Sequence, residues 1–334
     1  MEAFVPHRLL VTGGAGFIGS HLSERLLERG DDIRILDNFD RFYARRLKDA
    51  NLKNVHATAV ATGRSLEFVE GDIRDAETCE RSADGCEVIV HLAALAGVRP
   101  SLEEPARYWD VNLVGLQNLL STTKDASRRF VFGSSSSVYG GNEKVPFSEE
   151  DAVEEPVSPY AATKRAGELC CYTHHELYGT PISCLRFFTV YGPRQRPEMA
   201  IHKFTRLIEN GESVPMFGDG SSSRDYTYVD DIVDGVMRAI DRCGEVEPGY
   251  RIYNLGGSAT TSLAELIDSI GDALGKKPDI DTLPFQPGDV PKTFADVARS
   301  RDELGYEPKV PVSEGIRRFV KWYREAREHG ELEL

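Results

Sequence analysis

The segment TGGAGFIG, residues 12–19, joins a short apolar run to an amphipathic stretch, and it decides the fold. Its glycines have separate physical tasks. Gly13 permits a tight turn from strand to helix, and Gly16 lets backbone N–H groups approach a pyrophosphate. Gly19 allows the helix to pack closely on the sheet, while the helix N-terminus supplies a dipole that favours phosphate. The setting between strand and helix favours a dinucleotide-binding turn over a glycine-rich turn without a ligand.

The rest of the N-terminal half alternates apolar runs with helical patterns. The runs that predict strands are Arg8–Thr12, Asp32–Asp37, Leu66–Gly71, Val88–Leu92, Arg129–Ser134 and Ile182–Phe187. Helical patterns between them include Phe17–Arg29, Pro105–Ala126 and Tyr160–Tyr178. Strands that alternate with helices favour right-handed crossovers, so we predict an α/β fold with a Rossmann-like, doubly wound parallel sheet.

Proline and glycine become frequent after about residue 190, which indicates a second, smaller α/β domain for the substrate. Helices are predicted there at Ser262–Leu274 and Val312–Glu328. The run Tyr250–Gly256 predicts a strand that returns to the first sheet, so the domains interleave. The expected division is a cofactor-binding domain at residues 1–190 with a returning segment near 230–258, and a substrate domain at residues 191–334.

Composition excludes several classes of protein. The net charge is −14, from 54 acidic and 40 basic residues, which works against binding of a nucleic-acid backbone. The six cysteines form no Cys-x-x-Cys pair, and no histidine stands at zinc-finger spacing, so no metal site is expected. No apolar run approaches the roughly 20 residues that cross a bilayer, and the first strand begins too early for a signal peptide. We expect a cytoplasmic protein with reduced thiols.

The second predicted strand ends in Asp37, whose carboxylate can bind both ribose hydroxyls of a dinucleotide. A carboxylate there repels a 2′-phosphate and therefore favours NAD over NADP, although Arg41, Arg45 and Arg46 leave NADP open. Asp72 and Ile73, just past the third strand, can bind the amino group and the ring of adenine. Asp72 has the alternative of an ordinary turn residue at a strand end.

Two further segments carry chemistry: GSSSSVY at residues 133–139 and YAATK at residues 160–164. One helical turn places Lys164 on the same face as Tyr160. A nearby ammonium and a nicotinamide cation would lower the phenol pKa, so that Tyr160 can accept a proton from an alcohol. The Tyr-x-x-x-Lys pair alone is weak, because a surface pair arises easily by chance. It gains weight because it follows a dinucleotide turn and a hydroxyl cluster, whose Ser136 and Ser137 could otherwise be turn residues.

With these motifs, with HLAA at residues 91–94 and with RDYTYVDD at residues 224–231, the chain resembles an extended short-chain dehydrogenase/reductase of the nucleotide-sugar epimerase/dehydratase family, from residue 8 to about residue 325. The resemblance implies NAD as cofactor, with Ser135, Tyr160 and Lys164 as catalytic residues. The cofactor set is then Gly13, Gly16, Phe17, Ile18, Gly19, Asp37, Asn38, Asp72, Ile73, Leu92, Ala93, Ala94, Asn112, Tyr160 and Lys164. Asn112 is expected at a structural water or the sugar, and Arg224 at the UDP diphosphate.

Residues that differ from those of particular branches of the family narrow the range of reactions that the resemblance implies. The 4,6-dehydratases place Asp-Glu after the catalytic hydroxyl residue and the decarboxylating enzymes place Glu there, whereas this chain has Ser136-Ser137. The segments FFTVYGP at residues 187–193 and RPEMA at residues 196–200 resemble the corresponding segments of UDP-glucuronate 4-epimerases. The segment HLAALAGVRPS at residues 91–101 favours the same enzymes. UDP-glucose 4-epimerases usually carry Asn where this chain has Thr189.

The resemblance implies a substrate site that accepts a carboxylate at C6 of the hexose, with hydroxyls of Ser136 and Thr189 and the cation of Arg196 as its partners. The whole substrate set is Ser136, Ser137, Arg99, Thr189, Arg196, Val214, Phe217, Arg224 and Asp289. Arg194 and Arg196 have the alternative of loop residues or phosphate contacts. Gln286 stands where related enzymes often carry a diphosphate-binding Arg, which leaves more of the anion binding to Arg224 and Arg196.

The implied reaction is inversion at C4 by transient oxidation, rotation of the 4-keto sugar and reduction on its other face. A UDP-glucose or UDP-N-acetylglucosamine 4-epimerase is the nearest alternative, and a non-catalytic sensor of NAD or nucleotide sugar is a distant one. The helices predicted at Pro105–Ala126 and Tyr160–Tyr178 carry apolar residues on more than one side. They fit a homodimer interface, as the family resemblance implies, or burial beneath the second domain.

Overall fold

The computed structural model describes residues 7–125, 128–245, 249–257, 259–284 and 290–332. Within these residues a seven-stranded sheet forms the centre of the molecule, and every paired neighbour in it is parallel. Its order is β11-β6-β5-β4-β1-β2-β3. The strands are β1 Arg8–Thr12, β2 Asp32–Asp37, β3 Leu66–Glu70, β4 Val88–His91, β5 Arg129–Ser135, β6 Ile182–Phe187 and β11 Tyr250–Leu255. The predicted strands are confirmed to within one residue at their ends.

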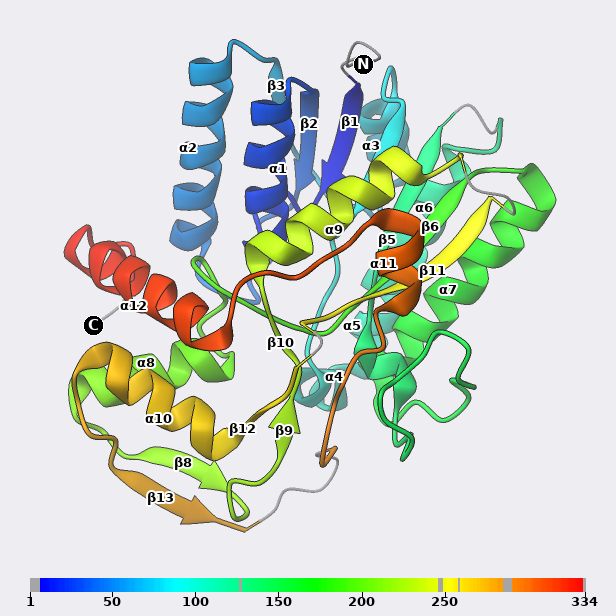
Figure 1. Ribbon diagram of the computed structural model, residues 1–334. Helices are drawn as coiled ribbons and strands as arrows, with labels where there is room; N and C mark the ends of the chain where they lie inside the picture. Colours follow the sequence, from blue (N-terminus) through cyan, green and yellow to red (C-terminus); the bar gives the residue numbers. More distant parts are fainter. Residues whose placement is uncertain (1–6, 126–127, 246–248, 258, 285–289, 333–334) are drawn as a thin grey trace.

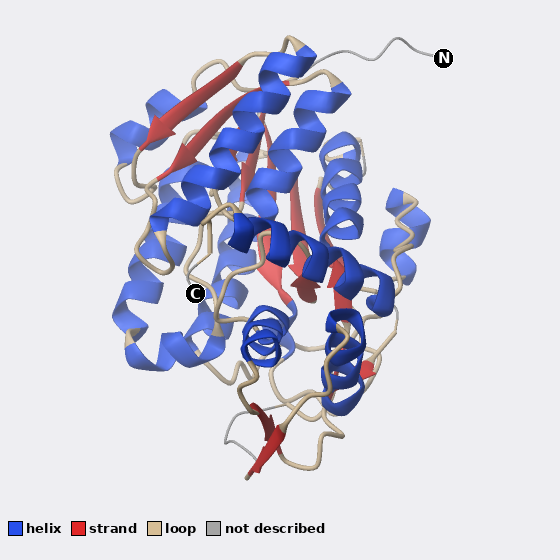
Figure 2. Ribbon diagram, turned by 90° about the vertical axis from the view of Figure 1, so that its left-hand side faces the viewer, coloured by secondary structure: helices blue, strands red, loops and turns tan. Residues whose placement is uncertain are grey.

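Helices cover both faces of this sheet, as Figures 1 and 2 show. On one face α1 packs against α2 and α9, and on the other α6 packs against α3 and α7. Their bounds are α1 Phe17–Arg29, α2 Arg45–Thr62, α3 Ala76–Ala83, α6 Gly115–Ser121, α7 Pro159–Tyr178 and α9 Val229–Arg242, with the shorter α4 Val98–Glu103, α5 Pro105–Trp109 and α11 Ala298–Leu304. Two covered faces explain why the strands read as nearly continuous apolar runs.

The helix predicted over Pro105–Ala126 is wrong as a single element. It consists of α5, a π-helical turn η1 at Asp110–Val114, and α6, which ends at Ser121. The wider turn is a local departure of the kind found at functional sites, and it includes Asn112. Apolar periodicity does not register such a turn, because the flanking helices continue in nearly the same direction.

The C-terminal part forms a smaller α/β unit below the carboxyl ends of the sheet strands (Figure 1). Its short strand pairs are β7 Thr189–Tyr191 with β10 Tyr226–Tyr228, β8 Val214–Phe217 with β13 Ile280–Leu283, and β9 Ser223–Arg224 with β12 Thr261–Ser262. Helix α10, Leu263–Leu274, packs against α8, Ala200–Asn210, and α12, Val312–Glu328. Ser262 caps α10 in a reciprocal capping box with Glu265, which explains why this helix begins one residue after the predicted Ser262.

The chain returns to the sheet through β11, which pairs with β6 as predicted. The exact domain boundary at residue 190 stays a prediction. The order of the strands reverses between β1 and β4, since the chain crosses from β3 back to the other side of β1. Ligands of doubly wound sheets bind at this kind of switch point, outside the carboxyl ends of the strands. In the described part of the chain, no helix combines the length and the apolar character needed to span a membrane.

Candidate active site

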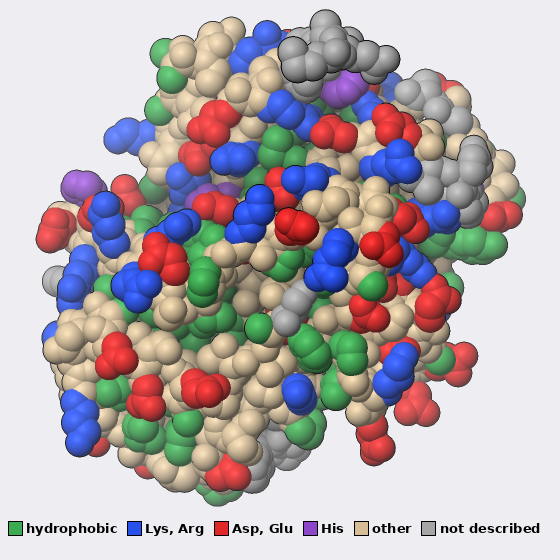
Figure 3. Space-filling model, in the orientation of Figure 1, with side chains coloured by type: hydrophobic (Ala, Val, Ile, Leu, Met, Phe, Trp, Pro, Cys, Tyr) green, Lys and Arg blue, Asp and Glu red, His purple; other side chains and the backbone are tan. Residues whose placement is uncertain are grey.

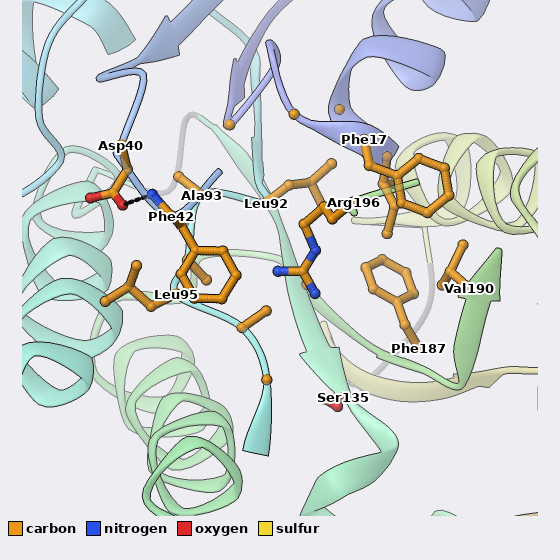
Figure 4. A pocket seen from close by; sticks show the side chains of 18 of the residues that line it. Phe17, Asp40, Phe42, Leu92, Ala93, Leu95, Ser135, Phe187, Val190 and Arg196 are labelled. Carbon is orange, nitrogen blue, oxygen red and sulfur yellow. Dashed lines mark hydrogen bonds between the residues drawn. The ribbon is translucent and has the colours of Figure 1, made fainter. Parts of the chain in front are cut away.

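A cavity of about 370 Å³ lies at this switch point. That volume is in the range of about 300–1,000 Å³ usual for small-molecule sites. Figure 4 shows its walls, with Phe17, Leu92, Ser135, Phe187 and Arg196 around the open space. From the expected sets, the cavity is lined by Gly13, Gly16, Phe17, Ile18, Gly19, Asp37, Asn38, Ile73, Leu92, Ala93, Ala94, Ser135, Ser136, Ser137, Tyr160, Lys164, Thr189 and Arg196. Residues from both halves of the chain therefore share one site.

The glycine turn at one end of the cavity has no room for side chains. Gly13 has a φ of +72°, and a Cβ there would lie 2.8 Å from the backbone nitrogen of Ala93. A Cβ at Gly19 would lie 2.2 Å from the carbonyl oxygen of Gly13, so only glycine lets α1 approach the turn this closely. These contacts confirm the tight turn and the close helix packing that the segment predicts, and they leave a cradle of backbone that fits a pyrophosphate.

Asp37 lies beside this turn at the end of β2. Its carboxylate accepts hydrogen bonds from the backbone N–H groups of Ala15 (3.1 Å) and Phe39 (2.9 Å), and burial raises its pKa. Two of the arginines that kept NADP open have other surroundings: Arg45 forms an ion pair with Glu70 at 2.9 Å, and the Arg41 side chain is 83% exposed. A carboxylate without a facing arginine fits the unphosphorylated ribose of NAD.

Asp72 does not line the cavity, although Ile73 does. Its carboxylate accepts hydrogen bonds from Arg74 and from the side-chain amide of Asn38. These bonds, with that from Arg74 the largest, lower the pKa of Asp72 to about 2. The expected contact of Asp72 with adenine stays a prediction.

Ser135, Tyr160 and Lys164 line the same cavity, each less than a tenth exposed. Ser135 ends β5 and caps the following 3₁₀ turn, because its Oγ accepts a hydrogen bond from the N–H of Ser137 at 3.2 Å. Tyr160 and Lys164 come from the first turns of α7, which Ser158 caps. Lys164 Nζ donates to the carbonyl oxygen of Gly133 at 2.7 Å, so Lys164 is fixed to the strand that carries Ser135.

Burial controls the ionisation of this pair. It raises the pKa of Tyr160, while a hydrogen bond from Ser135 and the charge of Arg196 act in the opposite direction. It lowers the pKa of Lys164 to about 8. The prediction that a nearby ammonium and a nicotinamide cation together lower the phenol pKa concerns the enzyme with bound cofactor, and it stays a prediction. The positive charge of the nicotinamide ring is the contribution that the protein by itself lacks.

Asn112 was expected to contact a water of the cofactor pocket or the sugar, and this contact stays a prediction. The side chain is buried outside the cavity lining. Its amide donates to the Leu95 carbonyl (3.0 Å) and to Thr163 Oγ1 (3.0 Å), and its oxygen accepts from the Leu95 N–H (2.8 Å). Asn112 thus ties the loop after β4 to helix α7. Both partners are distant in sequence, and no local pattern points to them.

The remaining substrate residues divide into different groups. The guanidinium of Arg99, in α4, lies 5.5 Å from the centre of the Phe217 ring, which brings α4 against β8. Arg224 donates to the carbonyl oxygen of Ser223, and its contact with a diphosphate stays a prediction. Val214 was expected to bind substrate, but it is fully buried in the hydrophobic core and exposes no atoms to a ligand. Asp289 and Gln286 lie outside the described residues.

Sequence reasoning missed Lys48 and Tyr43, which both line the cavity near Asp37. Lys48 Nζ donates to the carbonyl oxygen of Asp40 at 2.5 Å and lies 4.5 Å from the centre of the Tyr43 ring. A lysine that is only 5% exposed is rare unless it has a partner or a ligand. Its position in the first turn of α2 resembles that of an ordinary solvated helix residue, so the sequence offers no signal for it.

Comparison with known proteins agrees with this site. The model of the NAD dependent epimerase/dehydratase family matches residues 9–256. A probable UDP-glucuronate 4-epimerase of Rhizobium meliloti is 39% identical over 335 residues, covering 95% of this chain and 96% of that protein. UDP-glucuronic acid 4-epimerase from Bacillus cereus, solved with UDP-glucuronic acid and NAD, is 32% identical with a TM-score of 0.87, covering 95% of this chain and 99% of that chain. UDP-N-acetylglucosamine 4-epimerase from Methanobrevibacter ruminantium is 32% identical with a TM-score of 0.86, and the match covers 96% of this chain and 99% of that chain. The chain therefore belongs to the NAD dependent epimerase/dehydratase family, which confirms the family predicted from the sequence.

Proposed function

We propose that this NAD-dependent nucleotide-sugar epimerase interconverts UDP-glucuronate and UDP-galacturonate. The observation that carries the proposal is one cavity that combines two kinds of group. The catalytic residues Ser135, Tyr160 and Lys164 line it, and so do a hydroxyl and a cation, Thr189 and Arg196, that can bind a carboxylate at C6. The activities named for the Rhizobium and Bacillus relatives support the same substrate.

The reaction needs a proton acceptor at the 4-hydroxyl of the sugar. Tyr160, as phenolate, takes that proton, and Ser135 hydrogen-bonds the same oxygen and stabilises the charge that moves between them. Lys164 keeps the strand end and the phenol in place through its bond to the Gly133 carbonyl. When bound, NAD would supply the hydride chemistry at C4 of the sugar, taking up the hydride in the oxidation and returning it in the reduction of the 4-keto sugar. The 4-keto sugar then turns over while its UDP stays anchored, and Tyr160 returns the proton.

A carboxylate at C6 adds a hazard, since the 4-keto sugar is then a β-keto acid. Such an acid loses CO₂ when the bond from C5 to the carboxylate aligns with the π system of the carbonyl. Hydroxyls of Ser136 and Thr189 and the guanidinium of Arg196 can hold the carboxylate out of this alignment. The serine pair at positions 136 and 137 also leaves the site without the acid and base that dehydration needs.

The test is incubation of the purified protein with UDP-glucuronate, without added NAD, followed by NMR of the products. UDP-galacturonate without CO₂ is the expected result. Conversion of UDP-glucose or UDP-N-acetylglucosamine in place of UDP-glucuronate would leave the epimerase mechanism but refute the substrate. The similarity to the Methanobrevibacter enzyme makes UDP-N-acetylglucosamine the second substrate to try.

Replacement of Thr189 by Val is expected to release CO₂ and give UDP-pentose beside the epimer. The change keeps the shape and removes the hydroxyl that restrains the carboxylate. Product ratios by NMR measure the effect. Thr205→Val is a matched control, because this buried Thr of α8 has no partner for its hydroxyl among the described residues. A Thr189→Val enzyme that gives epimer alone would refute the restraint.

We further propose a homodimer that forms through the outer faces of α5, α6 and α7. Large apolar side chains project there into solvent: Trp109, Leu169, Tyr172 and Leu177. Burial of such a patch in an antiparallel helix bundle removes it from water. Leu169→Glu is expected to convert a dimer to a monomer in light scattering. Val60→Glu, at a more exposed apolar residue of α2, is expected to leave the mass unchanged. A mass of one chain for the parent protein would exclude the dimer.

A cytoplasmic location is part of the same proposal, and it fits the six cysteines, all of which are free thiols. Figure 3 shows acidic and basic side chains interspersed on the face it displays. Such a mixed surface does not favour a nucleic-acid backbone there.

A further inference from the structure

The segment that carries Arg196 connects β7 to α8, and we refer to residues 192–199 as the Arg196 loop. At its centre Arg194 has a φ of +66°, in the left-handed region of the backbone that residues other than glycine rarely adopt. Such a conformation persists only where the surroundings hold it. The question is therefore which contacts hold Arg194 in this conformation.

The contacts come from helix α1, far away in the sequence. Arg194 Nη2 donates to Glu24 Oε1 at 3.0 Å, and the two side chains are only 14% and 17% exposed. Arg194 Nη1 donates to Ser20 Oγ at 3.3 Å. His21 adds a bond of 3.0 Å from its Nε2 to the carbonyl oxygen of Pro193. Burial, assisted by the charge of Arg194, lowers the pKa of His21 to about 3, so the neutral ring donates this bond.

These contacts place the neighbouring Arg196 where it can act. Figure 4 shows its side chain extending into the middle of the cavity, toward Phe42 and Phe187. Its guanidinium lies 5.3 Å from the centre of the Phe42 ring and forms an ion pair with Glu198 at 3.2 Å. Because α1 begins at the glycine turn, the same rigid helix positions both the cofactor end of the cavity and the Arg196 loop.

We propose that the Arg194–Glu24 ion pair is a latch that holds the Arg196 loop on α1 and thereby keeps the guanidinium of Arg196 in the cavity to bind an anionic substrate. Arg194 and Glu24 are positioning residues, since neither lines the cavity. The role of Arg196 rests on the proposed function, whereas the latch itself concerns the loop alone. Two kinds of measurement therefore separate the failure of one from the failure of the other.

The kinetic test uses Glu24→Ala, which removes the carboxylate and leaves Arg194 in place. We expect kcat/KM for UDP-glucuronate to fall about 10- to 100-fold, mostly through KM, because a small displacement of a binding group has effects of this size. The NAD content should be unchanged. Glu24→Gln, which can still accept a hydrogen bond, is expected to recover part of the loss. Asp241→Ala is the matched control. Asp241, in α9, forms an ion pair at 2.7 Å with Arg29, which lies on α1 like Glu24, and this pair does not include the Arg196 loop.

The double variant with Arg196→Ala decides whether the latch acts through Arg196. If it does, Glu24→Ala causes no further loss in the Arg196→Ala background. If the double variant instead loses kcat/KM by the product of the two single losses, the two residues act independently and the proposal is overturned. Arg194→Gly separates the latch from backbone strain, because glycine adopts a positive φ freely but cannot bind Glu24. It is expected to behave like Glu24→Ala, and parent-like kinetics would overturn the latch.

Trypsin supplies a measurement that needs no substrate. The bond between Arg194 and Gln195 is a tryptic site within the loop, while the bond after Arg196 is protected by Pro197. In the holoenzyme, Glu24→Ala is expected to raise the rate of cleavage at Arg194 at least tenfold over Asp241→Ala, as judged by mass spectrometry. Equal rates would overturn the latch even if UDP-glucuronate proves to be a substrate. Faster cleavage together with no turnover of UDP-glucuronate would retain the latch and refute the proposed function.

Discussion

The Tyr160→Phe variant is expected to keep its NAD and to lose about a thousandfold in kcat, within the roughly 10²- to 10⁴-fold that a positioned acid–base group contributes. The ring of Tyr160 is buried, so phenylalanine preserves the packing of α7 against the cavity. The hydroxyl is the group that takes the proton from the sugar, and Ser135 is poorly suited to replace it because a serine hydroxyl ionises far less readily. Single-turnover measurements of NADH absorbance would show that oxidation at C4 is the step that fails.

Tyr108→Phe is the control for this change. Tyr108 packs edge-on against Tyr160 with ring centres 6.3 Å apart, and its hydroxyl donates to the Ala96 carbonyl at 2.8 Å. Removing that hydroxyl costs a neutral hydrogen bond, worth about 1 kcal/mol of stability, and should leave kcat within a few-fold. A Tyr160→Phe enzyme with kcat close to that of Tyr108→Phe would remove Tyr160 from the mechanism.

Much of the fold, and the meeting of the candidate catalytic residues in one cavity, could be predicted because their signals are local. The strand, the glycine turn and the helix after it occupy one continuous segment, residues 8–29, and Tyr160 and Lys164 stand one helical turn apart. Each signal depends on backbone geometry that neighbouring residues alone impose. The parallel sheet then follows from the alternation of strands and helices.

The residues that could not be predicted depend on contacts between distant segments. Asn112 holds Leu95 and Thr163, and the latch joins Glu24 to Arg194, yet none of these pairs has a spacing that a pattern could register. Family resemblance suggested substrate contacts for nine residues, but it does not say which side of a short strand faces the ligand. Val214, the first residue of β8, is fully buried in the hydrophobic core, and burial of this kind depends on packing that the resemblance does not supply.

Beneath the catalytic residues lies an ion pair with almost no exposure to water. Glu168 accepts hydrogen bonds from Arg186 at 2.8 and 2.9 Å and from Ser134 Oγ at 2.7 Å, and both members of the pair are at most 1% exposed. Arg186 also donates to the hydroxyl of Tyr139 at 3.0 Å. Glu168 lies one turn after Lys164 on α7, and Ser134 directly precedes Ser135. The pair therefore joins the helix and the strand that present the catalytic groups.

Glu168→Gln is expected to lower the free energy of unfolding by about 3–5 kcal/mol, because it leaves the buried charge of Arg186 without a counter-ion. The corresponding fall in Tm is roughly 4–7 °C, measured by thermal denaturation of the holoenzyme. Asp234→Asn serves as control, since it breaks the half-exposed helical pair with Arg238 and should cost less than about 0.5 kcal/mol. A Glu168→Gln protein as stable as this control would show that Arg186 is neutralised by other means.

The double variant Glu168→Met with Arg186→Met removes both charges and is expected to recover most of the stability, because the cost lies in the unpaired charge. If stability returns while kcat remains low, the ion pair serves mainly to hold Ser135 and Lys164 in place for the reaction. If kcat returns as well, apolar packing holds these two residues as well as the ion pair does.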